Sequence, residues 1–182
     1  MTLREFLCVL KADLIRLSPK HPSGIQPFEW GNIFNPRFTP VVILRIARFC
    51  YLSRTFRCMS PVFTWLNVLL FGIEVTPRCE IGPGLLLPHT HGTVIGASRI
   101  GANAIIFQGV TLGAKYAQMD YHPESRPTVD DDVMIGAGAK VLGGINIGSR
   151  ARIAANSLVI ESVPPDSTVI GVPAIIKNAN NH

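Results

Sequence analysis

Aliphatic residues recur every sixth position through the last two thirds of the chain, and this spacing constrains the fold more than any other feature. A period of six fits neither an α-helix nor an alternating β-strand. It is typical of short strands that turn after each hexad, so that three hexads close a triangular coil and successive coils stack. The positions form three runs: Val75, Ile81 and Leu87; Val94, Ile100, Ile106 and Leu112; Val129, Ile135, Val141, Ile147, Ile153 and Val159.

One aliphatic side chain of each hexad is expected to point into the coil. Burying such a side chain stabilises the fold by roughly 1.5–3 kcal/mol, so stacked coils can hold together although one coil alone cannot. The alternative is a sandwich or barrel of short strands. Those folds repeat their turn signals at roughly 8–12 residues, which is too long for this chain. The spacing therefore favours a stacked coil, although it does not set the handedness.

The six-residue register breaks at two places. The step from Leu87 to Val94 is seven, which places one extra residue within 88–93. The step from Leu112 to Val129 is seventeen, and residues 113–128 are rich in polar side chains, which predicts a loop that leaves the coil. Breaks in a regular solenoid are where functional residues are expected.

The first 72 residues differ from the rest. Helical periodicity covers Phe6–Leu17 and Val41–Ser53, and Pro61 opens a third apolar helix that reaches about Phe71, while Ser18–Pro40 is rich in proline and glycine. We therefore expect a helical segment at 1–72, a coil at 73–177 and a short tail at 178–182.

The excess of basic charge lies in the helical segment, which contains nine Lys and Arg residues but only three Asp and Glu residues. No nucleic-acid-binding module accompanies it, so an anionic membrane surface is the expected peripheral contact. No apolar run reaches the roughly 20 residues that a spanning helix needs. Without a secretory signal or paired cysteines, the sequence predicts a cytoplasmic protein that contacts the inner face of the membrane.

Four stretches between residues 72 and 174 resemble the serine acetyltransferase branch of the hexapeptide-repeat acyltransferases, which includes O-acetyltransferases of capsule and exopolysaccharide pathways. The resemblance implies a left-handed parallel β-helix, acetyl-CoA as acyl donor and a homotrimer with active sites between subunits. The stretches are Gly72-Ile73-Glu74-Val75-Thr76-Pro77, Gln108-Gly109-Val110-Thr111-Leu112-Gly113, Ile135–Gly143, and Val163–Thr168 with Gly171–Ala174.

In that branch a histidine before a glycine is the catalytic base, and His89 occupies its place before Gly92. A hydroxyl attacks a thioester poorly until a base removes its proton, and a neutral imidazole can do this near pH 7. Glu74 stands where the family carries an aspartate that orients the histidine. His91 is expected to contact the substrate rather than to act as the base.

The same resemblance implies that Gly113, Ala137 and Ala155 line the cofactor slot, where small residues let the backbone approach the pantetheine arm. Lys140 is the candidate contact for the phosphate end. No metal is expected. The alternative is a scaffold or a γ-carbonic-anhydrase-like metal protein, which would need His89, His91 and His122 around one ion.

The acceptor site departs from that of serine acetyltransferases. Pro88 replaces the aspartate that meets the amine of serine, and Arg126 stands where the family's Arg-His-Pro run has its histidine. His122 is the rival match. Because an unpaired ammonium is costly to bury, the sequence favours a sugar hydroxyl, free or lipid-linked, as acceptor. The alternative is serine O-acetylation in cysteine synthesis.

Overall fold

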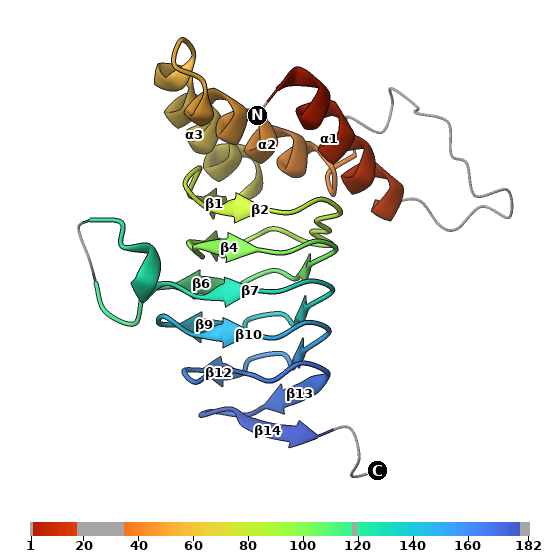
Figure 1. The fold of residues 1–182 in the computed structure, drawn as a ribbon, viewed down its shortest axis with the longest axis vertical. Helices are drawn as coiled ribbons and strands as arrows, with labels where there is room; N and C mark the ends of the chain where they lie inside the picture. Colours follow the sequence, from red (N-terminus) through yellow and green to blue (C-terminus); the bar gives the residue numbers. More distant parts are fainter. Residues whose placement is uncertain (1, 18–34, 118–119, 179–182) are drawn as a thin grey trace, which may run out of the picture.

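The hexads form a three-sided prism of parallel sheets, as expected from their spacing. The computed structural model describes residues 2–17, 35–117 and 120–178. Followed from β1 toward the C-terminus, the chain winds as a left-handed coil, which confirms the predicted fold (Figure 1). Within the described residues the strands pair in parallel, except that β14 runs antiparallel to β13.

Three sheets make the sides of the prism, named here faces 1, 2 and 3. Face 1 holds β1 (Ile73–Val75), β3 (Thr93–Ile95), β6 (Thr111–Gly113), β9 (Lys140–Leu142) and β12 (Leu158–Val159). Face 2 holds β2 (Glu80–Ile81), β4 (Arg99–Ile100), β7 (Thr128–Val129) and β10 (Asn146–Ile147). Face 3 holds β5 (Ile105–Ile106), β8 (Met134–Ile135), β11 (Arg152–Ile153), β13 (Ser167–Ile170) and β14 (Ile175–Asn178).

The interior of the prism is the predicted ladder of aliphatic side chains, with one correction. Ile100, Ile106, Leu112 and the later members of the runs are buried. In β3, however, Val94 points outward and Ile95 is the fully buried residue, paired with Val75 above and Leu112 below. The step after Leu87 is therefore eight residues rather than seven, and the next step is shortened to five.

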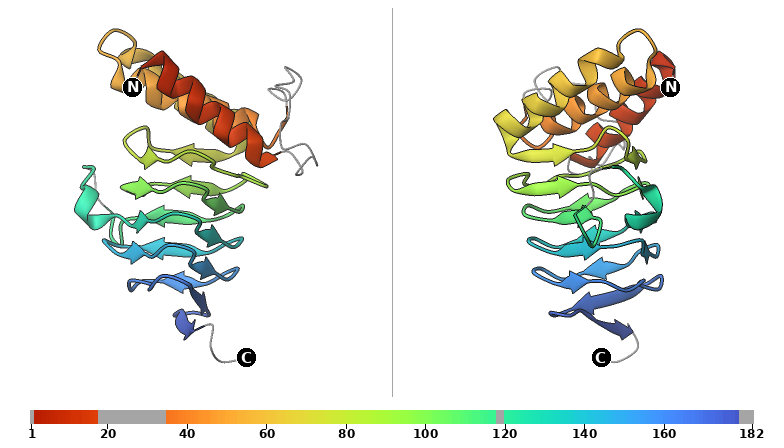
Figure 2. Two further views of the ribbon diagram at one scale, coloured as in Figure 1. Left: turned by 45° about the vertical axis from the view of Figure 1, so that its right-hand side comes forward. Right: turned by 90° about the vertical axis from the view of Figure 1, so that its left-hand side faces the viewer.

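The N-terminal helices cover the first coil. They are α1 (Leu3–Leu17), α2 (Thr39–Leu52) and α3 (Ser60–Phe71), with a short 3₁₀ turn η2 (Arg57–Met59) before α3 (Figure 2). Pro40 and Pro61 lie in the first turns of α2 and α3, where proline is tolerated. Gly72 ends α3 with φ +59°, and β1 follows directly. None of the described helices combines the length and the hydrophobicity that crossing a bilayer requires. The proline- and glycine-rich stretch at 18–34 lies outside the described residues.

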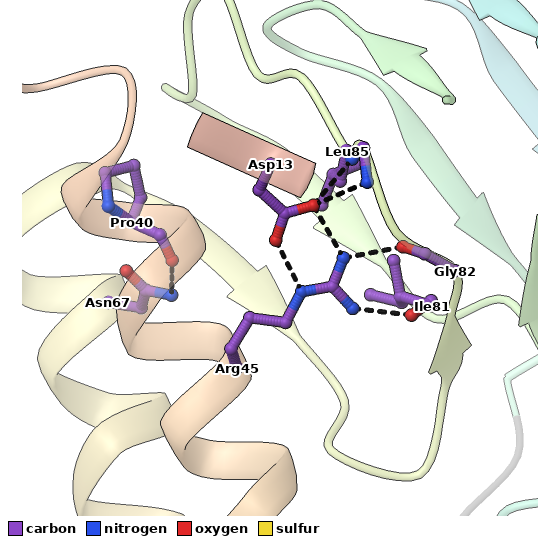
Figure 3. A network of polar contacts seen from close by, with 8 residues as sticks. Asp13, Pro40, Arg45, Asn67, Ile81, Gly82 and Leu85 are labelled. Atoms are coloured by element: carbon purple, nitrogen blue, oxygen red, sulfur yellow. Dashed lines mark hydrogen bonds and ion pairs between the residues drawn. The ribbon is translucent and has the colours of Figure 1, made fainter. Parts of the chain in front are cut away.

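A buried ion pair joins α1, α2 and the first coil (Figure 3). Asp13 accepts hydrogen bonds from Arg45 Nε at 2.9 Å and from the backbone amides of Gly84 and Leu85 at 2.8 and 2.9 Å. Arg45 also donates to the carbonyl oxygens of Ile81 and Gly82 at 2.5 and 2.6 Å. Burial raises the pKa of Asp13, while Arg45 and the two amides oppose that rise. One carboxylate and one guanidinium thus hold together three chain segments: α1, α2 and the stretch 81–85 of the first coil.

Candidate functional site

The loop Pro88–Gly92, at the first break in the register, is held in place by its backbone. Thr90 Oγ1 donates to the carbonyl of Phe71 at 2.9 Å, and the amide of Gly92 donates to the carbonyl of Gly72 at 2.9 Å. The amide of Gly109, one coil further on, donates to the carbonyl of His91 at 3.0 Å. Gly92 adopts φ +70°, which glycine allows without strain. The inserted residues therefore form an ordered turn between the end of α3 and the coil.

This loop forms one wall of a cavity of about 670 Å³. The other walls come from the turn before α2, the C-terminal end of α3 and the following coil. Such a volume is in the range of small-molecule sites. The lining residues are Pro36, Arg37, Leu70, Phe71, Pro88, His89, Thr90, His91 and Gln108.

Both histidines of the loop line the cavity and are exposed. A side-chain carbon added at Gly72 would lie 3.0 Å from His91 Nδ1, so the His91 ring rests against the end of α3. His89 has no hydrogen-bond partner among the described residues, so its imidazole is available to a bound molecule. The structure therefore brings the predicted base and the predicted substrate contact into one cavity.

Glu74 does not reach His89 in the described structure. It points outward from the middle of β1 on face 1, opposite Val94, and is exposed. No hydrogen bond or ion pair joins its carboxylate to the described residues. Within the described residues of one subunit, no direct contact between Glu74 and His89 supports the predicted orienting role of Glu74.

Below His89, the chain enters face 1 in each coil along one edge of the prism, called here the leading edge. It comprises Pro88–Gly92, Gln108–Gly109, Ala137–Gly138 and Ala155–Asn156. Backbone bonds of 2.8 Å connect them: Gly138 N donates to Gln108 O, and Asn156 N donates to Ala137 O. Since neighbouring strands lie about 4.8 Å apart, three coil steps separate His89 from Ala155 by roughly 14 Å. The predicted cofactor residues Ala137 and Ala155 thus lie in line below the cavity.

Gly113, another predicted cofactor residue, lies across face 1 at its trailing edge, where the chain leaves the face. Gly113 is paired with Leu142, five residues beyond Ala137, which corresponds to more than about 10 Å along the strand direction. Lys140 lies between the two edges and donates to the carbonyl of Gly109 at 2.5 Å. One subunit therefore does not bring Gly113 together with Ala137 and Ala155.

The loop that leaves the coil after β6 also returns at the trailing edge, and it contains the short turn η3 (Pro123–Ser125) (Figure 1). Tyr121 stacks against the guanidinium of Arg126 at 4.4 Å and donates to the carbonyl of Ala97 at 3.1 Å. Burial raises the pKa of Tyr121, which keeps that donor protonated. Arg126 also donates to the carbonyl of Gly96 at 2.9 Å. The predicted substrate contact Arg126 thus fixes the loop and does not line the cavity of its own subunit.

The predicted contact His122 also lies away from the cavity. It is exposed, and its Nδ1 lies 3.3 Å from a carboxylate oxygen of Glu124 in the same loop. Among residues 2–17, 35–117 and 120–178, no group of three potential ligands is placed to hold a metal ion. The three-histidine site of the metal-protein alternative is therefore not assembled within this subunit.

Three polar residues of the cavity, Arg37, Thr90 and Gln108, were not identified as site residues from the sequence. Arg37 comes from the turn before α2, outside the repeat, and only the packing of the helices on the coil brings it to the histidines. Gln108 could have been identified, because it opens one of the motifs and lies one coil below His91. Its Oε1 is buried and has no hydrogen-bond partner among the described residues.

Comparison with known proteins supports the same assignment of fold and family. Residues 126–161 match the family model described as bacterial transferase hexapeptide (six repeats). The serine acetyltransferase of Synechococcus elongatus is 40% identical over 90% of this chain, and that of Bacillus subtilis is 40% identical over 92%. The chain spans 66% of the first relative's length and 76% of the second's.

Two similar solved structures are complexes with a ligand. A Neisseria gonorrhoeae serine acetyltransferase in complex with serine shares 32% identity, with a TM-score of 0.79 over 96% of this chain and 70% of that one. A serine acetyltransferase in complex with CoA shares 28% identity, with a TM-score of 0.80 over 96% and 71%. These relatives are named for serine and not for a saccharide. The prediction of a sugar hydroxyl as acceptor is therefore wrong, and the alternative is favoured.

Proposed function

Because this chain belongs to the serine acetyltransferase family of hexapeptide-repeat transferases, we propose that it transfers the acetyl group of acetyl-CoA to the hydroxyl of L-serine. The observation that carries the proposal is the position of His89. Its exposed imidazole lines a cavity of about 670 Å³ at the top of the edge that carries Ala137 and Ala155. A base, an acceptor cavity and a slot for an extended thioester thus follow one another along one edge.

In the proposed reaction, a ring nitrogen of His89 removes the hydroxyl proton of serine as the oxygen attacks the thioester carbon. The C–O bond forms first, which gives a tetrahedral intermediate with a negatively charged oxygen. The C–S bond then breaks, and the imidazolium returns its proton to the sulfur of CoA. O-acetylserine and free CoA leave, and His89 is neutral again. General-base catalysis of this kind contributes typically 10²–10⁴-fold.

We also propose that the working unit is a trimer in which the leading edge of one subunit meets the trailing edge of the next. Ala137 and Ala155 lie on the leading edge, whereas Gly113 and Arg126 lie on the trailing edge. An edge-to-edge trimer would bring the two groups together around one cofactor. Lys140, on the face between the edges, would then lie close to the seam.

An assay of CoA release tests the function directly. With acetyl-CoA and L-serine, the purified full-length protein should release CoA thiol and form O-acetylserine at a rate near the usual enzymatic range of about 10 s⁻¹. Acetyl-CoA without serine should give only slow hydrolysis. Equal rates with and without serine would contradict the proposed acceptor.

Glu74→Gln should lower turnover by less than the loss of the base itself, by about tenfold or less. We assign Glu74 an indirect role because it makes no contact with His89 within the subunit, although a carboxylate near an imidazolium favours its charged form. Steady-state kinetics over pH 5.5–9 measure the effect. A shift of the acidic limb toward lower pH supports an electrostatic role, whereas an unchanged profile and rate would remove Glu74 from the catalytic group.

The exposed apolar face of α3 is proposed to be covered by another copy of the chain. Trp65 and Leu69 are 65% and 75% exposed, and α3 carries no charged residue. The double variant Trp65→Glu, Leu69→Glu should therefore lower the mass of the assembly in sedimentation velocity. The matched control Val172→Glu, at the far end of the coil and 70% exposed, should not. An unchanged mass, with binding to anionic vesicles lost, would instead support the predicted membrane contact.

A further inference from the structure

The cavity next to His89 has an unusual charge for a site that takes an amino acid. Its lining includes one guanidinium, that of Arg37, and two imidazoles. No carboxylate is found among the described residues that line it. Pro88 occupies the position where the family carries an aspartate, and it has no group that pairs with an ammonium. The cavity can therefore attract the negative end of an acceptor, but it offers its positive end no opposite charge.

Arg37 is held at the cavity by its neighbours in the chain. Its backbone amide donates a hydrogen bond to Asn35 Oδ1 at 3.0 Å, and the amide of Phe38 donates one to the carbonyl of Asn35 at 2.8 Å. Phe38 is 2% exposed and packs in the core. The carbonyl of Pro40 accepts a hydrogen bond from Asn67 of α3 at 3.0 Å, which ties the start of α2 to the helix that ends at the cavity. The turn that carries Arg37 is therefore fixed relative to His89.

The guanidinium of Arg37 is unengaged, in contrast to that of Arg126. Arg37 is exposed, and its side chain makes no hydrogen bond or ion pair within residues 2–17, 35–117 and 120–178. Arg126 stacks on Tyr121 and bonds to Gly96 at the trailing edge. A planar guanidinium with free donors binds carboxylates in a two-pronged geometry. Arg37 is thus the better placed cation for an acceptor that lies beside His89.

From this arrangement we infer that Arg37 binds the carboxylate of the acceptor and so determines specificity, and that the ammonium group of serine contributes little to recognition. The inference rests on the proposed function and widens the acceptor from serine alone to short hydroxy acids, with serine as one member. A hydroxyl that lies two carbons from the carboxylate carbon can then reach His89 while Arg37 holds the acid. Removal of the amine should be tolerated, and removal of the carboxylate should not.

Two analogues of serine separate these contributions. 3-Hydroxypropionate keeps the hydroxyl and the carboxylate but lacks the ammonium, whereas ethanolamine keeps the hydroxyl and the ammonium but lacks the carboxylate. The wild-type enzyme should acetylate 3-hydroxypropionate with kcat/KM within about tenfold of that for serine. Ethanolamine should be at least about a hundredfold poorer, which corresponds to the loss of one charge-assisted contact.

Arg37→Gln should raise KM for serine and for 3-hydroxypropionate about tenfold or more, with kcat changed by less than about threefold, because the contact orients the acceptor and does not take part in proton transfer. The residual rate with ethanolamine should stay unchanged. Arg37→Lys should recover part of the affinity. The matched control is Arg152→Gln on face 3, an exposed arginine far from the cavity, which should behave like the wild-type enzyme.

Binding is measured separately from turnover, by calorimetric titration of the protein with 3-hydroxypropionate. Saturable binding in the wild type, weakened in Arg37→Gln and kept in Arg152→Gln, is the expected result. If serine is acetylated but Arg37→Gln matches the control, this inference is wrong and the proposed function stands. If serine is not acetylated while 3-hydroxypropionate binds through Arg37, the proposed acceptor is wrong and the inference stands. Absence of Arg37-dependent binding overturns the inference whatever the activity.

Discussion

His89→Ala is expected to reduce turnover by at least about a hundredfold, the lower bound of what a positioned general base contributes. Without the imidazole, the hydroxyl of the acceptor must attack as a neutral group, and no other described residue of the cavity except His91 can accept its proton. The KM for acetyl-CoA should stay near the wild-type value, because the cofactor is proposed to lie along Ala137 and Ala155. Steady-state kinetics of CoA release measure both quantities.

His91→Ala is the matched control for this change. His91 lines the same cavity and is also exposed, but its ring rests against Gly72. We expect a smaller loss of turnover, below about tenfold, with a rise in KM for the acceptor. Both variants should unfold at the wild-type temperature, because neither side chain is buried. Near-normal turnover in His89→Ala, with a large loss in His91→Ala, would transfer the role of base to His91.

Asp13→Asn is expected to lower the free energy of unfolding by about 3–5 kcal/mol, the cost of breaking a buried ion pair by removing one partner. Arg45 would remain 5% exposed without a counter-charge. An asparagine amide would also direct its own N–H groups at some of the donors that Asp13 now satisfies. Urea denaturation at a fixed protein concentration, followed by circular dichroism, measures the change.

The exposed ion pair between Arg150 and Asp166 offers the matched comparison. Its two hydrogen bonds are each 2.6 Å long, shorter than those of the buried pair, but both side chains are about 60% exposed. Asp166→Asn removes the same charge with the same change of shape, and solvent screens what is lost. Its effect should therefore be much smaller. Equal effects of the two substitutions would show that Asp13 does not clamp the helices to the coil.

The sequence predicted the coil well because its perimeter fixes the spacing of buried positions. Val129, Ile135 and Val141 are all fully buried. Each is three hexads, one full turn of the coil, before its equivalent in the next coil. The register failed at one strand only. An inserted residue can be absorbed anywhere in the loop after Leu87, and Val94 and Ile95 are both aliphatic, so the pattern had no means to choose the inward one. Hydrogen bonding of β3 to its two neighbours makes that choice.

The cavity was predictable only in part, for a related reason. His89 and His91 stood out because they interrupt a regular repeat. Arg37 belongs to a helical segment whose position on the coil depends on tertiary contacts such as the Asp13–Arg45 pair, and sequence spacing carries no information about those. Arg126 and His122 were predicted to join the histidines, yet the structure places them across face 1. A pattern along one chain cannot tell which edge of a prism a residue occupies in an assembly.

The two ends of the prism are covered in different ways, and this restricts how copies of the chain can assemble into larger oligomers. A parallel coil presents unpaired backbone groups at each end, to which another coil could add without limit. Here helices occupy the first end, and the antiparallel strand β14 occupies the last, with a hydrogen-bond pattern that a parallel strand does not continue. We therefore expect that the coils do not add end to end into filaments. The proposed trimer, which associates through the sides, would close into a finite particle.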